Sequence, residues 1–343
     1  MRTFWEGAFK GGGCVLLTLL SALAMSGCAP SGPSPEDVKE FLSQPQMQFK
    51  SYDFDPKIPL ENRIGPCPGF LVESMKSMDQ KTDYQAYTPT PREKDLIRGY
   101  LATLPAPMLQ AYRERLLGIY FVKNFTGNGM SGWVPDGAGR IYSWLALNPA
   151  AFDKTISETL TGRETSVFAG DAPVTVDCGS KYKGVLYTVL HEGLHAYDYI
   201  RGVTPYVEDM VVYSTRNGKG LGVSWDVWQS IKKPRSDADF PHRDRLHFYG
   251  LGGGAAIPAA EAAKVYKDLM DSPFPSLYAS RSWAEDAAEL FTFYHLTRAL
   301  SQPYAIRVAG SQPTTLEPMK AGKALGRARR IYGFLYPASS AAR

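Results

Sequence analysis

The residues best suited to chemistry are five in a row, His191-Glu192-Gly193-Leu194-His195, which match the H-E-x-x-H pattern. They lie within Val185–Ile200, an apolar stretch without proline that predicts a buried helix. On a helix the two histidines share one face, one turn apart, so both imidazoles can reach the same zinc ion. Glu192 lies beside that face and can take a proton from a water held by the metal. The pattern therefore indicates hydrolytic metal chemistry.

A catalytic zinc site needs a third protein ligand and keeps one position open for water. Ser282–Leu300 has the right form, because Glu285 and Glu289 lie four residues apart on one face of a predicted helix. Ser282-x-x-Glu285 also has the spacing of a capping box, which would make Glu285 a surface residue. We predict Glu285 as the third ligand, because the two histidines leave a ligand vacancy and no other downstream segment has this form. Glu289 can then accept a hydrogen bond from a liganding imidazole.

Two segments, HEGLHAYDY (His191–Tyr199) and YASRSWAEDAAE (Tyr278–Glu289), resemble the catalytic domain of anthrax lethal factor and its bacterial relatives. These proteins are Glu-zincin metallopeptidases. The resemblance implies an α+β, zincin-like metalloprotease fold, in which a mixed β-sheet packs on an active-site helix and the C-terminal part is mainly helical. It covers residues 118–299 at most, and its motifs are confined to the two segments.

The resemblance also implies a set of roles, with Zn²⁺ as the cofactor. The zinc ligands would be His191, His195 and Glu285, and Glu192 would be the general base. The Tyr278 hydroxyl would face the oxyanion that develops during the reaction. Asp198 and Glu289 would be acids that support the ligands. A plain packing role for Tyr278 is the alternative, since the chain has 20 tyrosines.

Residues 1–27 have the pattern of a bacterial lipoprotein signal peptide. Arg2 and Lys10 give a basic start, and an apolar run too short to span a bilayer leads to small residues before Cys28. We expect Cys28 to be lipidated and to anchor the protein in the bacterial cell envelope, at the outer membrane facing the periplasm. A plain secretory signal is the alternative. Residues 28–50 are predicted to form a flexible tether after this cysteine.

Charge and cysteine content narrow the remaining classes. The formal net charge of +4 falls to +3 without residues 1–27, which hold two basic residues and one acidic residue, so nucleic-acid binding is not indicated. Cys67 and Cys178 are the cysteines left after the lipidated one, and in an oxidising compartment they suggest one disulfide. Two unpaired buried thiols are the alternative.

Residues 51–117 are predicted to form an N-terminal extension with helices, and residues 118–335 the metallopeptidase domain. Within that domain, residues 118–125 and 140–147 have the composition of strands. Residues 140–147 are our candidate for an edge strand that holds an extended peptide by main-chain pairing, with an ordinary core strand as the alternative. The Gly-rich residues 202–254 are predicted to form an irregular insertion over the catalytic side.

The sequence thus predicts a zinc metalloendopeptidase that hydrolyses a protein or peptide substrate in the cell envelope. The alternative is a catalytically silent binding or scaffold lipoprotein that keeps a zincin fold. A zinc amidase acting on peptidoglycan is disfavoured, because H-E-x-x-H suits endopeptidases better.

Overall fold

The largest sheet backs the helix that carries the two motif histidines. The computed structural model describes residues 2–3, 32–310, 313–320 and 322–336. The sheet has the strand order β1-β5-β6-β4-β2, and β3 also pairs with β4. β5 and β6 run antiparallel, whereas β4 runs parallel to β6 and to β2, so the sheet is mixed. Its strands are β1 (Arg2–Thr3), β2 (Ile64–Pro66), β3 (Gln85–Ala86), β4 (Leu116–Lys123), β5 (Gly129–Pro135) and β6 (Ile141–Leu147).

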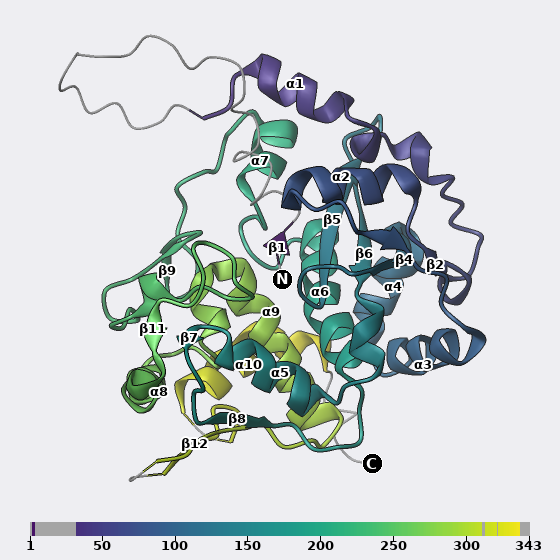
Figure 1. The fold of residues 1–343 in the computed structure, drawn as a ribbon. Coiled ribbons are helices and arrows are strands. Elements are labelled where there is room, and N and C mark those ends of the chain that lie inside the picture. The colour runs from purple at the N-terminus through teal and green to yellow at the C-terminus, as the bar shows by residue number, and fades with distance from the viewer. Residues whose placement is uncertain (1, 4–31, 311–312, 321, 337–343) are drawn as a thin grey trace, which may run out of the picture.

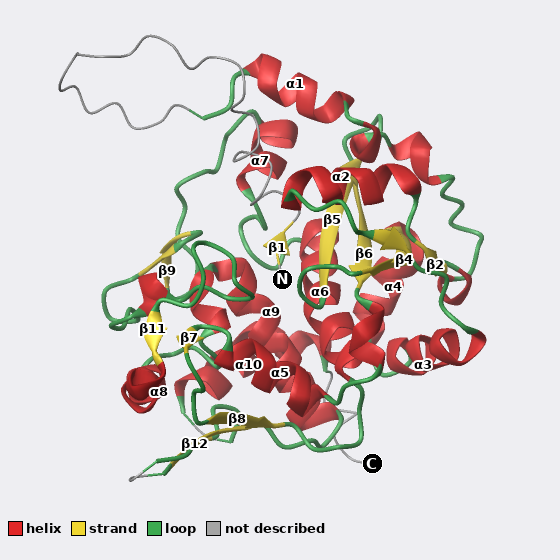
Figure 2. Cartoon of the chain, in the orientation of Figure 1, coloured by secondary structure: helices red, strands yellow, loops and turns green. Residues whose placement is uncertain are grey.

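Helices surround this sheet, and three smaller sheets of two or three strands in the described part of the chain lie apart from it (Figures 1 and 2). The α-helices are α1 (Pro35–Ser43), α2 (Gly69–Asp79), α3 (Pro91–Leu101), α4 (Ala106–Arg115), α5 (Ile156–Thr165), α6 (Gly184–Arg201), α7 (Asp209–Arg216), α8 (Ala262–Asp271), α9 (Trp283–Tyr294) and α10 (Lys323–Tyr332). The smaller strands are β7 (Phe168–Ala169), β8 (Val174–Asp177), β9 (Trp228–Ser230), β10 (Lys233–Pro234), β11 (Ile257–Pro258), β12 (Ala305–Val308) and β13 (Thr314–Leu316). The chain is thus an α+β protein with a mixed sheet, as predicted.

Helix α6 is buried along almost its whole length, from Gly184 to Ile200, as its apolar sequence predicts. It lies alongside β5 and β6, with α9 next to it (Figure 1). Gly193 allows α4 to approach closely: the Tyr112 hydroxyl donates to the Gly193 carbonyl at 2.5 Å, and a Cβ on this glycine would lie 2.6 Å from that hydroxyl. The helix ends before Gly202, which has the left-handed φ of +73° that favours glycine.

Strand β5 contains two glycines, Gly129 and Gly132, a residue type that local propensity disfavours within strands. Close packing explains both of them. A Cβ on Gly129 would lie 2.5 Å from Thr188 Cγ2 of α6, and one on Gly132 would lie 2.3 Å from Trp144 Cζ2 of β6. Larger residues would push β5 away from its neighbours, so glycine here serves a strand.

The prediction that residues 140–147 form an edge strand is wrong. β6 is an inner strand, paired with β5 on one side and β4 on the other. β5 lies beyond β6, and in the described residues its far side pairs with the two-residue end strand β1 at Met130 and Ser131. Of the two strands that pack on the motif helix, β5 and not β6 therefore lies nearer the end of the sheet.

The predicted boundaries of the N-terminal parts also need correction. The predicted tether at 28–50 holds α1 from Pro35 onward, and Phe41 of α1 packs against Trp133 with ring centroids 5.9 Å apart. The predicted extension at 51–117 contributes β2 and the start of β4 to the main sheet. Its core is continuous with that of the predicted catalytic part. Residues 35–117 are therefore integral to the folded body.

The predicted disulfide between Cys67 and Cys178 is wrong. Both are free, buried thiols. Cys67 follows β2 of the main sheet and Cys178 follows β8 of a separate small sheet, so the two lie in different layers. Burial raises the pKa of each thiol well above its usual range, so both stay protonated and unreactive.

The predicted signal peptide and the lipidated Cys28 lie outside the described residues, apart from Arg2–Thr3. Of the helices in the described part of the chain, none has the length and apolar character that a bilayer crossing requires.

Candidate metal centre and active site

Helix α6 presents His191 and His195 on one face. Their ring centroids lie 5.0 Å apart with the planes steeply inclined at 79°. Both side chains are buried. The i, i+4 spacing of the motif thus places two imidazole Nε2 atoms on one buried side of the helix, where they face α9.

Helix α9 supplies the third group. Glu285 Oε2 lies 2.9 Å from His191 Nε2 and 3.5 Å from His195 Nε2. One ligand atom from each of the three residues lies within 4.8 Å of the other two. Ser282 caps the helix by accepting from the Glu285 backbone N–H at 3.2 Å, while the Glu285 side chain turns inward. The backbone N–H of Glu285 therefore takes part in the helix cap, whereas its carboxylate contacts the two histidines.

The three residues fit a zinc ion. Two imidazole nitrogens and one carboxylate oxygen are the donor set of many catalytic zinc sites. In the described structure His195 Nε2 is buried and has no hydrogen-bond partner. A buried polar atom without a partner is costly, and a cation among the three groups would satisfy it.

The buried charges around the site also favour a cation. Four carboxylates, those of Glu164, Glu192, Glu285 and Glu289, are buried here, and among the described residues Arg163 is the buried arginine that pairs with two of them, Glu164 and Glu289. Buried carboxylates are costly without positive partners. Arg163 can balance one of them, so a divalent ion would relieve much of the remaining negative charge.

The carboxylate of Glu192 lies near the histidines but forms no hydrogen bond with them. Both of its carboxylate oxygens are buried and have no hydrogen-bond partner among the described residues. Burial raises its pKa, and the nearby His191 and His195 oppose that effect. Strand β5 passes close to it, because a Cβ on Gly129 would lie 3.4 Å from Glu192 Cγ. An unpartnered carboxyl with a raised pKa is suited to exchanging a proton with a water.

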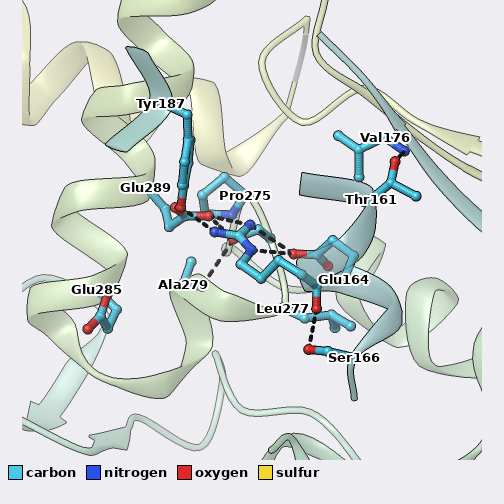
Figure 3. Close-up of polar contacts among 12 residues, drawn as sticks. Thr161, Glu164, Ser166, Val176, Tyr187, Pro275, Leu277, Ala279, Glu285 and Glu289 are labelled. Carbon is cyan, nitrogen blue, oxygen red and sulfur yellow. Dashed lines mark hydrogen bonds and ion pairs between the residues drawn. The ribbon is translucent and has the colours of Figure 1, made fainter. Parts of the chain in front are cut away.

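Glu289 lies one turn after Glu285 and supports His191 from behind. Its Oε1 lies 2.9 Å from His191 Nδ1 and accepts from the Tyr187 hydroxyl at 2.5 Å, while its Oε2 accepts from the Ser276 hydroxyl at 2.6 Å. Figure 3 shows Tyr187 directed toward Glu289, with Glu285 apart from this cluster. This carboxylate fixes the ring so that Nε2 faces the site.

Burial alone would raise the pKa of Glu289, but Arg163 and His191 outweigh it and bring that pKa to about 2. The pKa of Glu285 is also held far below its usual range, because burial, which would raise it, is outweighed by the neighbouring imidazoles of His191 and His195. Both acids are therefore carboxylates at neutral pH, as a ligand and its supporting group must be.

Tyr278 reaches the same region from a short 3-10 turn at Tyr278–Arg281. Its buried ring lies with its centroid 5.8 Å from that of His191. Phe248, from the predicted insertion at 202–254, packs edge-on against it at 4.9 Å. The insertion is less irregular than predicted, since it contains α7, β9 and β10.

Asp198 has different partners from those that its predicted supporting role implies. Its oxygens accept from the backbone N–H groups of Val203 and Thr204, at 2.6 and 2.9 Å, and from the Thr204 hydroxyl at 2.7 Å. No hydrogen bond in the described structure joins it to His195. Asp198 therefore anchors the loop after α6 instead of a liganding imidazole.

Three side chains of the buried cluster were absent from our sequence-based site: Arg163, Tyr187 and Ser276. Tyr187 precedes His191 by four residues, so the helical period already placed it on the histidine face. Arg163 and Ser276 lie on other elements, and no motif in the sequence marks them.

Comparisons with known proteins found no protein-family model, no curated protein and no solved structure that matches this chain.

Proposed function

We propose that this protein is a zinc-dependent peptidase with a zincin-like fold that hydrolyses a protein or peptide substrate in the bacterial cell envelope. The observation that carries the proposal is the convergence of His191, His195 and Glu285 within 4.8 Å beside the unpartnered Glu192. Three ligands with a neighbouring carboxyl that binds none of them is the arrangement that metal-assisted hydrolysis requires.

When bound, zinc would supply Lewis acidity at the scissile carbonyl. Glu192 takes the proton of the attacking water and passes it to the leaving amine. The Tyr278 hydroxyl donates a hydrogen bond to the oxyanion that develops on the carbonyl oxygen. Glu289 keeps the His191 ring oriented throughout, through the contact with Nδ1.

A peptide substrate is favoured by the outer edge of β5, which passes beside Glu192. The backbone of this strand pairs with β1 at Met130 and Ser131, which supports the capacity of this edge to accept an extended segment. The location in the envelope rests on the sequence of residues 1–28. Cell fractionation of a Cys28→Ala variant tests it, with release from the membrane fraction as the expected result.

The second candidate is a zincin-fold scaffold protein that binds zinc without turnover. The state of Glu192 weighs against it. A buried carboxyl with neither oxygen hydrogen-bonded destabilises a fold, and a protein that had lost catalysis would have no use for it.

The two candidates are distinguished by peptide cleavage with purified full-length protein. A casein or peptide-library assay is run on wild-type protein, on chelator-treated protein, on the same sample with zinc restored, and on Glu192→Gln. We expect chelation to abolish cleavage, zinc to restore it, and Glu192→Gln to bind zinc normally but cleave at least 10²-fold more slowly. Stoichiometric zinc without cleavage of any peptide would favour the scaffold.

A further inference from the structure

The buried side chain of Arg163, on α5, contacts two parts of the proposed site: Glu289, which lies behind the predicted zinc ligand His191, and the ring of Tyr278. It lies 2.8 Å from Glu289 and 2.8 Å from Glu164, and is 1% exposed. It also donates to the Tyr187 hydroxyl. A fully buried arginine is rare unless its contacts are specific, so each of these contacts needs an explanation.

The first contact reaches the metal side. Glu289 Oε2 accepts from Arg163 while Oε1 of the same carboxylate faces His191 Nδ1. The guanidinium thus lies directly behind the acid that orients a predicted zinc ligand. It supplies the positive charge that keeps this buried acid ionised and fixed in place.

The second contact reaches the oxyanion side. The Arg163 guanidinium lies 5.0 Å from the centroid of the Tyr278 ring and 5.3 Å from that of Tyr187. Cations within about 6 Å of an aromatic face are attracted to it. Because Phe248 packs edge-on against Tyr278, this ring has a contact with the insertion as well as with Arg163.

Arginine suits this position better than lysine. Its planar guanidinium has five donors and a flat face, so it can bind two carboxylates and a hydroxyl while lying against aromatic rings. Glu164, the second carboxylate, is itself held by the Tyr266 hydroxyl at 2.7 Å. A lysine could restore the charge but could not make all of these contacts.

We propose that Arg163 is a positioning residue that couples the metal ligand His191, through Glu289, to the oxyanion-facing Tyr278. This inference rests on the proposed function. The Arg163 guanidinium holds in a fixed relation the two groups that act on the same carbonyl oxygen, the metal held by His191 and the Tyr278 hydroxyl, so loss of this guanidinium weakens zinc binding and slows turnover at saturating zinc.

The test uses full-length protein with Arg163→Met, which keeps the volume and removes the charge, and Arg163→Lys, which keeps the charge. Arg327→Met is the matched control, because Arg327 is also buried and pairs with Asp286 of α9 without contacting His191 or His195. Zinc affinity is measured by competition with a chromogenic chelator, thermal unfolding by circular dichroism, and kcat and KM on a cleaved peptide.

We expect Arg163→Met to bind zinc 10- to 100-fold more weakly, the range typical for residues behind metal ligands. Its kcat at saturating zinc should fall at least tenfold with little change in KM, and Arg163→Lys should recover zinc affinity more than kcat. If Arg163→Met only melts earlier, as the control does, with wild-type zinc affinity and kcat, the proposal is overturned. A loss of zinc affinity in Arg327→Met as large as that in Arg163→Met would also contradict it, because removing any buried arginine that pairs with an acid of α9 would then have the same effect.

Two further outcomes are separated by design. If Arg163→Met does not fold, the double variant Arg163→Met with Glu289→Gln removes both charges, and wild-type zinc affinity in that protein overturns the inference. If wild-type protein binds zinc but cleaves nothing, the proposed peptidase function fails, while the zinc affinities of the Arg163 variants still decide whether this residue positions His191.

Discussion

Helix α9 carries buried acids on two faces, and the two faces are satisfied in different ways. Asp286 turns away from α6 and accepts from the Trp228 indole N–H at 2.8 Å and from the Arg327 guanidinium. Arg327 in turn lies 2.6 Å from Asp226. Glu285, the residue before Asp286, turns toward α6 and meets His191 and His195 instead.

The difference indicates which acid serves the fold and which serves chemistry. Burial raises the pKa of Asp286 and Arg327 opposes this, so a permanent positive charge from the chain balances the acid. Histidines can be neutral at neutral pH, and they must be neutral to bind zinc, so Glu285 has no permanent positive partner. We infer that the Asp286 face holds α10 against α9, and that the Glu285 face is kept for an ion.

The largest expected effect is on the Glu285 face. Glu285→Gln removes one negative ligand while keeping the shape of the side chain, and we expect zinc affinity to fall by more than the 10–100-fold typical of residues behind the ligands. Peptide cleavage should be lost with it. Chelator competition measures the affinity. Asp286→Asn is the matched control on the other face, and a comparable loss of zinc affinity there would remove the distinction between the two faces.

The Asp286 face should respond in stability instead. Arg327→Met leaves Asp286 buried without its cation, and breaking such a pair typically costs about 3–5 kcal/mol. Urea unfolding of the zinc-loaded protein measures this loss. Zinc affinity should stay within twofold of wild type; a weaker binding that follows the loss of stability would mean that both faces form one cooperative unit.

An effect on rate alone is expected at Tyr278. Tyr278→Phe keeps the ring between Arg163 and Phe248 but removes the hydroxyl, so zinc affinity and stability should change little. Loss of one oxyanion donor commonly costs about 10²–10³ in kcat, or about 2.7–4 kcal/mol. Steady-state kinetics on a cleaved peptide measure it. An unchanged kcat would assign Tyr278 to packing, the alternative that the sequence left open.

The local parts of the Glu285 face could be predicted from the sequence. Within a helix, spacing fixes direction, so the pattern around His191 and the pair Glu285 and Glu289 placed these side chains on defined faces. The meeting of the two helices could be anticipated because two histidines alone do not complete a zinc site. The ion pair between Arg163 and Glu289 could not be predicted, because Arg163 reaches Glu289 from α5 and no local rule connects residues so far apart in sequence.

Strand β5 illustrates the same limit. Glycines at 129 and 132 favour turns by local propensity, and only contact with Thr188 and Trp144 shows why a strand needs them. Asp198 shows the reverse case. Its position after the motif suggested support for a histidine, but the nearby backbone N–H groups of the loop after α6 bind it first. Tertiary contacts decide the roles of such residues, and the spacing of residues in the sequence does not reveal those contacts.

The smallest expected effect is on the pH dependence of stability, which should differ between the Glu285 face and the Asp286 face. In protein freed of metal with a chelator, a proton on His191 replaces the cation. Burial lowers the pKa of this imidazole, but Glu285 and Glu289 on its two nitrogens raise it to about 9, from 6.5. A group whose pKa is raised on folding stabilises the fold fully below pH 6.5, and this contribution, at most ~3 kcal/mol, is lost as the pH rises through 9.

We therefore expect the urea midpoint of metal-free protein to fall between pH 6.5 and 9, and that of zinc-loaded protein to fall less, because a bound ion does not titrate in this range. The Asp286 face provides the control, since a guanidinium keeps its proton throughout. Metal-free Arg327→Met should unfold at lower urea at every pH but with the same pH slope as metal-free wild type. Equal slopes with and without zinc would show that His191 carries no such proton, and that the two faces of α9 do not differ in the way proposed.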